Sequence, residues 1–433
     1  MKRNPSRRAF VQSVAGAGAA SLLSMPAFAY KNIVGANDRL NIGVIGVGGR
    51  GAGDLAGVAG ENIVALCDVS ETTLNAAANG FPQAKKFFDY RELLEMDRLD
   101  AVVVATPDHH HAPATVRALN RGLHVYCEKP LTHTVAEARQ IAKLAKQKGV
   151  ATQMGTQNHE HPGYLRLIEL LRSGAIGTIR AVHVITDRPG NWWAQGLDRP
   201  TDKPEVPADL KWDLWQGPAP VRDYNPAYVP FRWRGWWDYG CGAIGDMAIH
   251  LMDPAFWGLD LGGPVRITSQ GPPVHADSGP KWMATHFEFG QRGDKPAVDL
   301  FWYEGDAQPP AEIAAELPMN GSLFIGDKGR IAIAHDQFPK LLPEEKFNDF
   351  IPPAPFLAES PGHHRQWIDA CKSDNKTGSP FSYAGPFTEV VLLGNVAYRI
   401  GEPINYDPAQ MKITNIARAN DLLSKPYRKG WEI

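Results

Sequence analysis

Short apolar runs alternate with longer amphipathic stretches over the first third of the chain. The runs are rich in valine, isoleucine and alanine, which is typical of strands buried on both faces of a parallel sheet. The predicted strands span residues 41–45, 63–67, 100–105 and 124–127, a further one starts at 150–152, and the predicted helices span 112–120 and 135–148. This order predicts an α/β domain with a doubly wound parallel sheet, whose ligands lie at the carboxyl ends of the strands.

A glycine-rich stretch, GVIGVGGRG at residues 43–51, includes the end of the first predicted strand and the turn after it. Gly46 permits a tight turn, Gly48 lets the backbone approach a pyrophosphate, and Gly51 lets a helix pack on the strand. The amides of that helix's first turn favour the negative charge of a phosphate. The stretch therefore predicts a Rossmann domain that binds a dinucleotide cofactor through Gly46, Gly48, Gly49, Arg50 and Gly51.

Asp68 lies at the end of the second predicted strand. Its carboxylate is placed to accept hydrogen bonds from the hydroxyls of the adenosine ribose, and it would repel a 2′-phosphate. This favours NAD over NADP as the cofactor. Arg50 offers an alternative, since a guanidinium there could bind a phosphate instead.

Polar residues follow the next two strands, where the crevice of a doubly wound sheet opens. Thr106 and Pro107 follow one strand and Glu128 follows the other, and we assign all three to the cofactor site. The three adjacent histidines at 109–111 suggest a metal site, but neighbouring side chains point in different directions and seldom converge on one ion. We therefore predict no metal. We expect one or two of these histidines, His111 among them, to line the nicotinamide crevice and the others to face solvent.

Composition narrows the class of protein further. The chain has 433 residues and a formal net charge of -2, with Lys+Arg 45 against Asp+Glu 47. That length suffices for at least two domains. Because the charges balance and form no basic block, we predict no nucleic-acid partner. The 4 cysteines are widely spaced and do not form the pattern of a disulfide framework.

The first 29 residues predict an export signal rather than a part of the fold. A basic start with the pair Arg7–Arg8 and then Phe10 precedes a weakly apolar run at 11–25 and a small-residue cleavage pattern at 27–29. The arginine pair resembles that of a twin-arginine signal, so we expect a periplasmic or otherwise exported protein. An ordinary secretory signal or a disordered basic tail is the alternative. The apolar run is too short and too poor in leucine and isoleucine for a stable membrane anchor.

Several motifs along the chain resemble those of one protein family. GVIGVGGRG at 43–51, ATPDHHHAP at 105–113 and CEKPLTH at 127–133 are similar to motifs of the Gfo/Idh/MocA family. The stretches at 238–254 and 405–415 extend the resemblance over nearly the whole chain after the export signal. The Glu-Lys-Pro tripeptide after a strand is among the more specific of these motifs.

The resemblance implies a domain organisation and an assembly. It places a Rossmann NAD-binding domain at 38–156, an α+β substrate domain at 157–400, and a tail at 401–433 that packs back on the body. The second domain is expected to contain an open, mostly antiparallel sheet with helices on one face. Because such open sheets commonly pair subunits in the family, the resemblance also implies a homo-oligomer.

The resemblance assigns Lys129 to the active site, where its ammonium group could bind a substrate hydroxyl and stabilise the developing alkoxide. Asp246 and His250 lie four residues apart, on one face of a predicted helix. Matching family positions carry an acid and a histidine in the substrate pocket. His250 would then be the general base, and Asp246 would bind a neighbouring hydroxyl or tune His250. The alternatives are a surface lysine, a helix-capping aspartate and a core histidine.

Tyr239 is a further candidate acid or base, and the loop-like segment at 187–237 supplies weaker substrate candidates. That segment is rich in tryptophan, tyrosine and proline. Flat aromatic faces suit sugar rings and guanidinium groups suit anions. We single out Trp193 and Arg234, and add Asn158, which with His159 is expected to face the cleft between domains. The alternative for the residues of the segment at 187–237 is packing against the sheet or an oligomer contact.

An exported protein has no NAD pool to draw on, whereas the twin-arginine route can carry a folded protein with its cofactor. We therefore expect an NAD(P)-dependent oxidoreductase that acts on a sugar or polyol hydroxyl with a tightly held, internally recycled cofactor. An alternative implied by the resemblance is a glycoside hydrolase that oxidises a hydroxyl transiently, eliminates the aglycone, adds water and reduces the ketone again. The glycine-rich stretch YGCGAIGD at 239–246 differs, however, from the GHGG stretch of relatives with that activity. A non-catalytic NAD- or sugar-binding protein is the third possibility.

Overall fold

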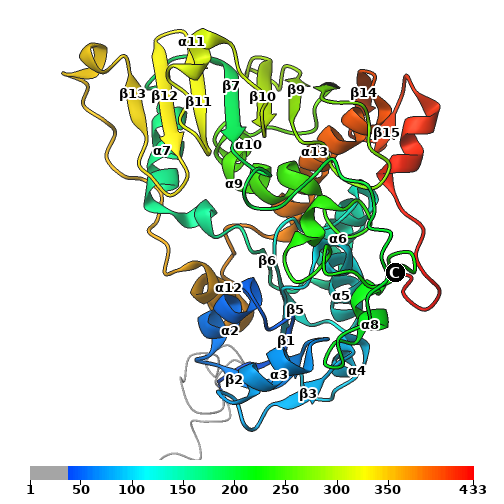
Figure 1. Cartoon of the computed structure of the whole chain (residues 1–433). Coiled ribbons are helices and arrows are strands. Elements are labelled where there is room, and N and C mark those ends of the chain that lie inside the picture. The colour runs from blue at the N-terminus through cyan, green and yellow to red at the C-terminus, as the bar shows by residue number, and fades with distance from the viewer. Residues whose placement is uncertain (1–37) are drawn as a thin grey trace, which may run out of the picture.

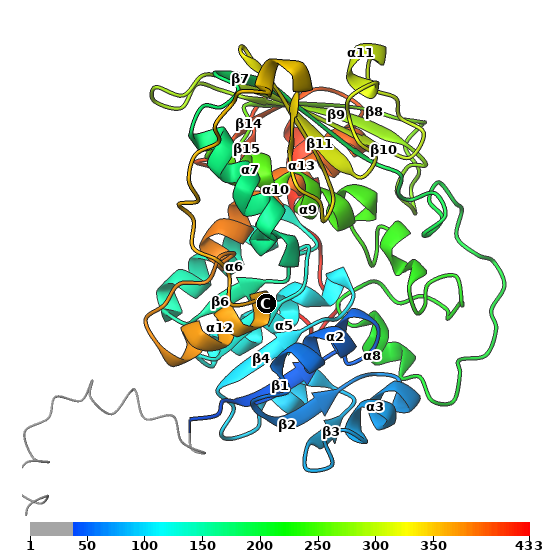
Figure 2. The ribbon, with the colours of Figure 1, turned by 90° about the vertical axis from the view of Figure 1, so that its left-hand side faces the viewer.

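Two β-sheets with helices between them make up the structure, a computed structural model that describes residues 38–433 (Figure 1). The parallel sheet lies in the lower half of Figure 1 and the second sheet at the top. The helices between them include α9 (Ile249–Leu251), α10 (Asp253–Gly258) and α13 (Phe381–Ile400), as the rotated view in Figure 2 also shows. The expected export signal at 1–29 lies outside the described residues.

The first sheet has six parallel strands in the order β3-β2-β1-β4-β5-β6. Its strands are β1 (Asn41–Ile45), β2 (Asn62–Cys67), β3 (Lys85–Phe87), β4 (Ala101–Val104), β5 (His124–Cys127) and β6 (Thr152–Met154). Its helices are α2 (Arg50–Val58), α3 (Glu71–Ala78), α4 (Tyr90–Leu94), α5 (Asp108–Asn120) and α6 (Val135–Lys148). The doubly wound parallel sheet predicted from the apolar runs is thus confirmed.

Local sequence explains where these helices begin. At α6 the Thr134 hydroxyl accepts a hydrogen bond from the Glu137 amide, and the Glu137 carboxylate accepts one from the Thr134 amide, so two otherwise unpaired amides are satisfied. α5 begins at Asp108, four residues before the predicted start. Pro107 precedes its first residue and Asp108 places a negative charge in its first turn, both of which favour a helix start.

The second sheet has nine strands in the order β13-β12-β11-β7-β10-β9-β8-β14-β15. Among the strands of residues 38–433 in this sheet, only β7 and β10 pair in parallel, and the other pairs are antiparallel, which confirms the open, mostly antiparallel sheet. The strands are β7 (Ile179–Thr186), β8 (Arg266–Gln270), β9 (Met283–Phe289), β10 (Val298–Glu304), β11 (Gly321–Gly326), β12 (Gly329–Ala334), β13 (Lys340–Leu342), β14 (Ile404–Asp407) and β15 (Lys412–Ile413).

Helices and single turns complete the second half and its connections. The remaining α-helices are α7 (Pro162–Arg172), α8 (Trp212–Gln216), α11 (Ala311–Ala314) and α12 (His363–Lys372). The 3-10 turns are η2 (Gln157–Glu160), η3 (Arg232–Gly235), η5 (Glu344–Phe347) and η6 (Ala417–Leu423), and the π turn is η4 (Ile244–Ala248). Between residues 38 and 433, no helix combines the length and apolarity that crossing a bilayer requires.

The linear domain boundaries expected at 157–400 and 401–433 do not follow the structure. β14 and β15, which lie in the expected tail, continue the second sheet beside β8. α12 packs on α2, and its buried Trp367 joins the core of the Rossmann half. The end of the chain also returns to that half, where the Arg91 guanidinium lies 4.0 Å from the centre of the buried Trp431 ring. Each half of the molecule is therefore built from segments that are distant in sequence, and no single cut of the chain separates the two halves.

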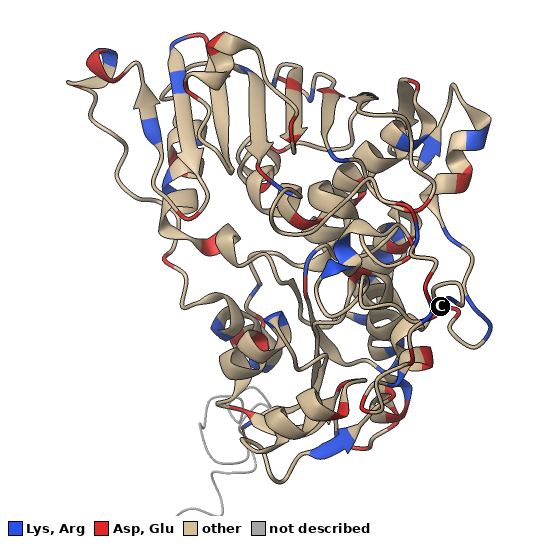
Figure 3. Cartoon of the chain, in the orientation of Figure 1, with Lys and Arg blue, Asp and Glu red and all other residues tan. Residues whose placement is uncertain are grey.

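Charged residues of both signs are interspersed along both halves of the chain (Figure 3). This distribution agrees with the nearly balanced composition of Lys+Arg 45 and Asp+Glu 47. The positive charges nearest the site, Lys129, Arg188 and Arg234, are partly buried.

Candidate functional site

The glycine turn between β1 and α2 has the geometry of a phosphate cradle. Gly46 has a φ of 81°, and a Cβ there would lie 2.6 Å from the Ala105 carbonyl oxygen. A Cβ on Gly51 would lie 1.9 Å from the Gly46 carbonyl oxygen, so the helix packs on the turn as closely as glycine allows. Gly49 directly precedes α2, and no other atom lies within 4 Å of the place that a Cβ on Gly49 would occupy. Space is thus open beside Gly49 at the N-terminus of α2, where a helix favours a phosphate.

Two residues beside the turn bear on which dinucleotide it takes. Asp68, at the end of β2, accepts hydrogen bonds from the amides of Val47 at 3.0 Å and Ser70 at 2.9 Å. Burial raises the pKa of Asp68, and these amide hydrogen bonds oppose that shift. Arg50 forms ion pairs with Asp54 at 2.8 Å and Glu128 at 3.3 Å. Its guanidinium is thus engaged by carboxylates, which weakens the alternative that Arg50 serves a phosphate.

The ends of β4 and β5 contribute further polar groups. The buried Thr106 hydroxyl has no hydrogen-bond partner within residues 38–433, so it is available to a ligand. Glu128 accepts a hydrogen bond from the Gln157 amide at 2.6 Å, and burial raises its pKa to about 8. The open glycine cradle, the unpartnered Thr106 and the carboxylates together fit a bound dinucleotide.

The three histidines of α5 are all buried, so the expectation that some face solvent is wrong. Their ring nitrogens lie beside backbone carbonyls instead. His109 and His110 contact the Trp215 carbonyl oxygen at 3.0 and 2.8 Å, and His111 contacts those of Pro130 at 2.6 Å and Thr106 at 2.8 Å. His111 therefore joins the ends of β4 and β5 as a positioning residue rather than lining an open crevice.

Burial of these rings predicts a measurable pH effect. Desolvation lowers the pKa of His110 to about 3, whereas an unfolded histidine titrates near about 6.5. The native state thus keeps His110 neutral, and this site costs stability as the pH falls below the unfolded pKa. For His110→Gln, whose side chain takes up no proton, the stability deficit relative to wild type should shrink by about 2 kcal/mol between pH 7 and pH 5. Urea unfolding at both pH values measures the deficit, and an unchanged deficit would contradict a neutral His110.

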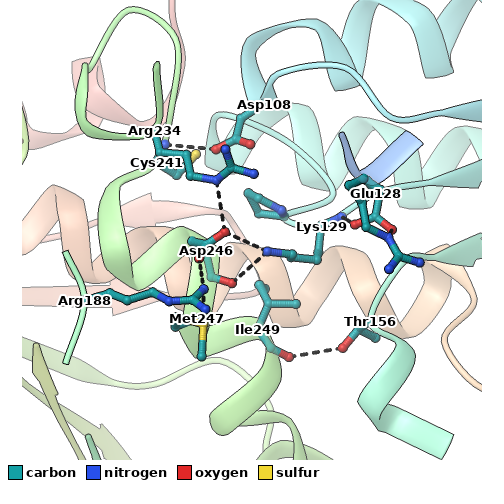
Figure 4. A network of polar contacts seen from close by, with 12 residues as sticks. Asp108, Glu128, Lys129, Thr156, Arg188, Arg234, Cys241, Asp246, Met247 and Ile249 are labelled. Carbon is teal, nitrogen blue, oxygen red and sulfur yellow. Dashed lines mark hydrogen bonds and ion pairs between the residues drawn. The ribbon is translucent and has the colours of Figure 1, made fainter. Parts of the chain in front are cut away.

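Lys129 is the second residue after β5 and points toward the π turn η4 (Figure 4). Its ammonium group lies 2.7 Å from Asp246 Oδ1 and donates to the Asp246 carbonyl oxygen at 3.2 Å. A residue at the carboxyl end of the Rossmann sheet thus contacts an element of the second half. This places a cation where the ligands of doubly wound sheets bind.

Buried Asp246 is the centre of a cluster of partly buried cations (Figure 4). Its Oδ1 contacts Lys129 and also Arg234 Nε at 3.4 Å, and its Oδ2 contacts Arg188 Nη1 at 2.5 Å. Burial alone would raise the pKa of Asp246, but the three cations hold it well below its usual range. Asp246 is therefore charged at neutral pH. It lies on a π turn, a local widening of the helix that often occurs at functional sites.

His250 follows on α9 and is 8% exposed. Its Nδ1 has no hydrogen-bond partner among the residues that the structure describes. Burial lowers the pKa of His250 well below its usual range, and the Lys129 ammonium and His335 reinforce this shift. The imidazole is thus neutral near pH 7. The Thr156 hydroxyl, after β6, donates to the Ile249 carbonyl at 3.3 Å and holds this segment against the Rossmann half.

Comparison with known proteins agrees with this geometry. A model of the Gfo/Idh/MocA oxidoreductase family with an NAD-binding Rossmann fold matches residues 40–156. A second model of the same family, describing its C-terminal alpha/beta domain, matches residues 166–299, so together they span more than half of the chain.

The chain belongs to the Gfo/Idh/MocA oxidoreductase family.

Named relatives and solved structures of similar proteins extend this finding. An inositol 2-dehydrogenase of Salmonella typhimurium is 31% identical over 150 residues, 33% of this chain and 45% of the relative. A Shewanella pealeana glycosyl hydrolase family 109 protein is 30% identical over 158 residues, 33% of this chain and 34% of the relative. The chain thus matches less than half the length of these curated relatives. The fold is also similar to that of the WlbA dehydrogenase from Bordetella pertussis in complex with NADH and UDP-GlcNAcA, with a TM-score of 0.59, 18% identity, and 85% and 99% of the two chains covered.

Not every residue singled out from the sequence joins this Gfo/Idh/MocA site. Tyr239 is fully buried among aromatic rings such as Trp215, 4.7 Å away, and its hydroxyl has no partner within residues 38–433. Trp193 is 3% exposed and donates to Gln195 at 2.9 Å, so it packs in the interior. His159 is buried against Asp253 at 2.8 Å and lines a pocket together with Glu160 and Trp257. The predictions for Tyr239 and Trp193 are corrected, because both side chains pack in the core.

Asn158 and Arg234 remain near the charged cluster. Asn158 lies beside Tyr164, whose hydroxyl donates to the His250 carbonyl at 3.1 Å, and Asn158 Nδ2 has no partner within the described part of the chain. Arg234 contacts Asp246 directly. The segment at 187–237, predicted to supply substrate residues, also contains Arg188 and Trp192. Arg188 lies 58 residues from Asp246 along the chain, so no local spacing could have revealed their contact.

Proposed function

We propose that this protein is an NAD-dependent oxidoreductase that oxidises a hydroxyl group of a sugar or polyol. The observation that carries the proposal is the meeting of Lys129, charged Asp246 and neutral His250 at the carboxyl end of the Rossmann sheet. The dehydrogenase among the relatives and the sugar nucleotide in the WlbA complex support the substrate class.

Lys129, His250 and Asp246 each have a separate role toward the substrate hydroxyl. Bound NAD supplies the acceptor for the hydride that leaves the carbinol carbon. Lys129 donates a hydrogen bond to the reacting oxygen and stabilises its developing negative charge. His250 accepts the hydroxyl proton, because it is neutral and its Nδ1 is not engaged by another protein group. Asp246 holds the Lys129 ammonium in place.

The test uses the purified protein with the cofactor it retains. Sugars and polyols are added without free NAD, and the near-ultraviolet absorbance of reduced nicotinamide is recorded. The proposal expects stoichiometric reduction by at least one of them. Release of the cofactor by denaturation identifies it, and we expect NAD because Asp68 disfavours a 2′-phosphate. Protein that retains no dinucleotide and takes up none would overturn the proposal.

A redox-neutral glycoside hydrolase is the second candidate. The glycosyl hydrolase family 109 relative favours it, since that protein is 30% identical over 158 residues. In that case Lys129 and His250 would again serve a transient oxidation, which acidifies the adjacent C–H and permits elimination of the aglycone. Aryl glycosides distinguish the candidates, since release of the aglycone without net reduced nicotinamide selects the hydrolase.

Export through the twin-arginine route, with the cofactor loaded beforehand and recycled within each turnover, completes the proposal. Its support is the pair Arg7–Arg8 ahead of a weakly apolar run. We expect the double substitution Arg7→Lys with Arg8→Lys to retain the uncleaved chain in the cytoplasm, as cell fractionation would measure. Arg3→Lys is the matched control and should be exported. Normal export of the double variant would exclude the route.

Self-association of two copies is expected through the outer face of the second sheet. Thr285 and Phe287 of β9 face α13, so the alternating His286 lies on the opposite face. There its ring stacks 4.4 Å from Phe301, which stacks 4.6 Å from His183. We expect wild type to have at least twice the monomer mass in light scattering and Phe301→Glu to dissociate. A monomeric wild type would contradict this prediction.

A further inference from the structure

The charged cluster around Asp246 holds more positive than negative charge. Lys129, Arg188 and Arg234 all direct a donor to this one carboxylate. No other ion pair involves any of the three within residues 38–433. Each of these side chains is less than one-fifth exposed, so water screens them poorly. Burying cations in excess of anions is costly unless a further anion completes the site.

The other titratable groups nearby do not remove this excess. Asp108 lies toward Arg234, but burial raises its pKa to about 7, so it is only partly charged at neutral pH. Asp336 pairs with His335 Nδ1 at 3.0 Å and is more than half exposed. Burial keeps His250 and His335 neutral by lowering the pKa of each. A positive nicotinamide ring in the oxidised cofactor would add to the excess.

The two arginines retain donors for a ligand. Arg188 Nε is buried and has no partner among the described residues, although Nη1 of the same guanidinium contacts Asp246. Arg234 uses Nε on Asp246 and Nη1 on the Phe231 carbonyl at 3.1 Å. A guanidinium presents five donors in one plane and binds carboxylate or phosphate oxygens in pairs.

Exposed aromatic rings lie against both guanidinium groups. Trp192 is 50% exposed and its ring centre lies 4.0 Å from the Arg188 guanidinium carbon. Phe231 is 39% exposed, and its ring centre lies 4.1 Å from the Arg234 guanidinium carbon. Cation–π contacts with these rings hold the guanidinium groups of both arginines in place. The rings are reachable from solvent while the arginines continue inward to Asp246, so a sugar ring could enter over them.

We propose that the substrate of this site is an anionic sugar or polyol, whose carboxylate or phosphate is bound by Arg188 and Arg234 while its hydroxyl faces Lys129 and His250. This inference rests on the oxidoreductase function proposed above. It names a substrate class within the sugars and gives Arg188 and Arg234 the role of selecting that class. Neutral sugars lack the group that balances the cluster and bind more weakly.

Matched pairs of ligands that differ in charge provide the test. Isothermal titration calorimetry with the NAD-loaded protein compares glucuronate with glucuronamide, galacturonate with galacturonamide, and glucose 6-phosphate with glucose. In at least one pair the anion should bind about tenfold more tightly or better. The uronate pairs and the phosphate pair distinguish the two kinds of anion. Equal or weaker binding of the anion in every pair would overturn the proposal.

Substitutions assign the effect to the two arginines. Arg188→Gln and Arg234→Gln should each reduce the anion preference by at least fivefold. Arg180→Gln, on the exposed side of β7, is the matched control and should keep the preference. A preference that survives both site substitutions would overturn the assignment.

The reduction of nicotinamide separates this inference from the proposed function. If neutral sugars reduce the bound cofactor and no pair shows an anion preference, the oxidoreductase stands and the inference fails. If an arginine-dependent anion preference exists but no sugar of either charge reduces the cofactor, the anion site stands and the oxidoreductase fails.

Discussion

Replacing Lys129 with methionine is expected to lower the rate at which a sugar reduces the bound nicotinamide by about a thousandfold. Methionine has nearly the length of lysine but neither charge nor donor, so the oxygen that becomes an alkoxide loses its hydrogen bond. Removal of one such preorganised donor typically costs a factor of about a hundred to a thousand. The loss should appear in the rate constant for reduction of the bound nicotinamide in a single turnover, measured by stopped-flow absorbance.

The variant should otherwise keep its structure and cofactor. Asp246 retains its contacts with Arg188 and Arg234, so the π turn keeps two of its three cationic partners. Circular dichroism and the NAD content should therefore match those of wild type. Lys143→Met, at an exposed position of α6, is the control and should leave the rate unchanged. A Lys129→Met protein with an unchanged rate would remove Lys129 from the reaction.

Much of the Rossmann half follows from short-range sequence patterns. β4 reads AVVV and is buried throughout, as a continuous apolar run predicts for a central parallel strand. Strand ends are then known to within a residue or two, and with them the positions of Gly46, Asp68, Thr106 and Glu128. Helix starts are less certain. α5 begins before its apolar residues do, because Pro107 and Asp108 rather than hydrophobic spacing determine its first turn.

The candidate site depends on contacts that no local pattern records. Asp246 and His250 were expected on one face of a regular helix, whereas Asp246 lies on a π turn. Asp246 nonetheless contacts Lys129 directly, and the charge of Lys129 helps to lower the pKa of His250. Trp193 was the predicted substrate residue, but Trp193 packs inside and its neighbour Trp192 faces solvent. Which of two adjacent aromatic residues is exposed is decided by the tertiary packing of the loop.

Gly51→Ala is expected to empty the cofactor site. A Cβ at this position would lie 1.9 Å from the Gly46 carbonyl oxygen and 3.1 Å from the Ala105 Cβ. Gly46 belongs to the turn between β1 and α2, and Ala105 directly follows the buried strand β4, so the glycine turn must shift by more than an ångström. The phosphate-binding amides of α2 move with it. We expect the NAD content of the purified variant to fall about tenfold or more, with a destabilisation of about 1–3 kcal/mol from overpacking.

Gly53→Ala, two residues further along the same helix, separates the cradle from helix propensity. The nearest atom to a Cβ at Gly53 is the Arg50 guanidinium carbon at 3.7 Å, an ordinary contact with a flexible side chain. Alanine is the better helix former by about 0.5–1 kcal/mol, so this variant should be at least as stable as wild type and retain its NAD. The ratio of NAD to protein after denaturation, measured beside the melting temperature, compares the two. If Gly51→Ala keeps its NAD as Gly53→Ala does, the dinucleotide is not held by the turn at residues 46–51, and the position assigned to the reacting hydroxyl beside Lys129 loses its basis.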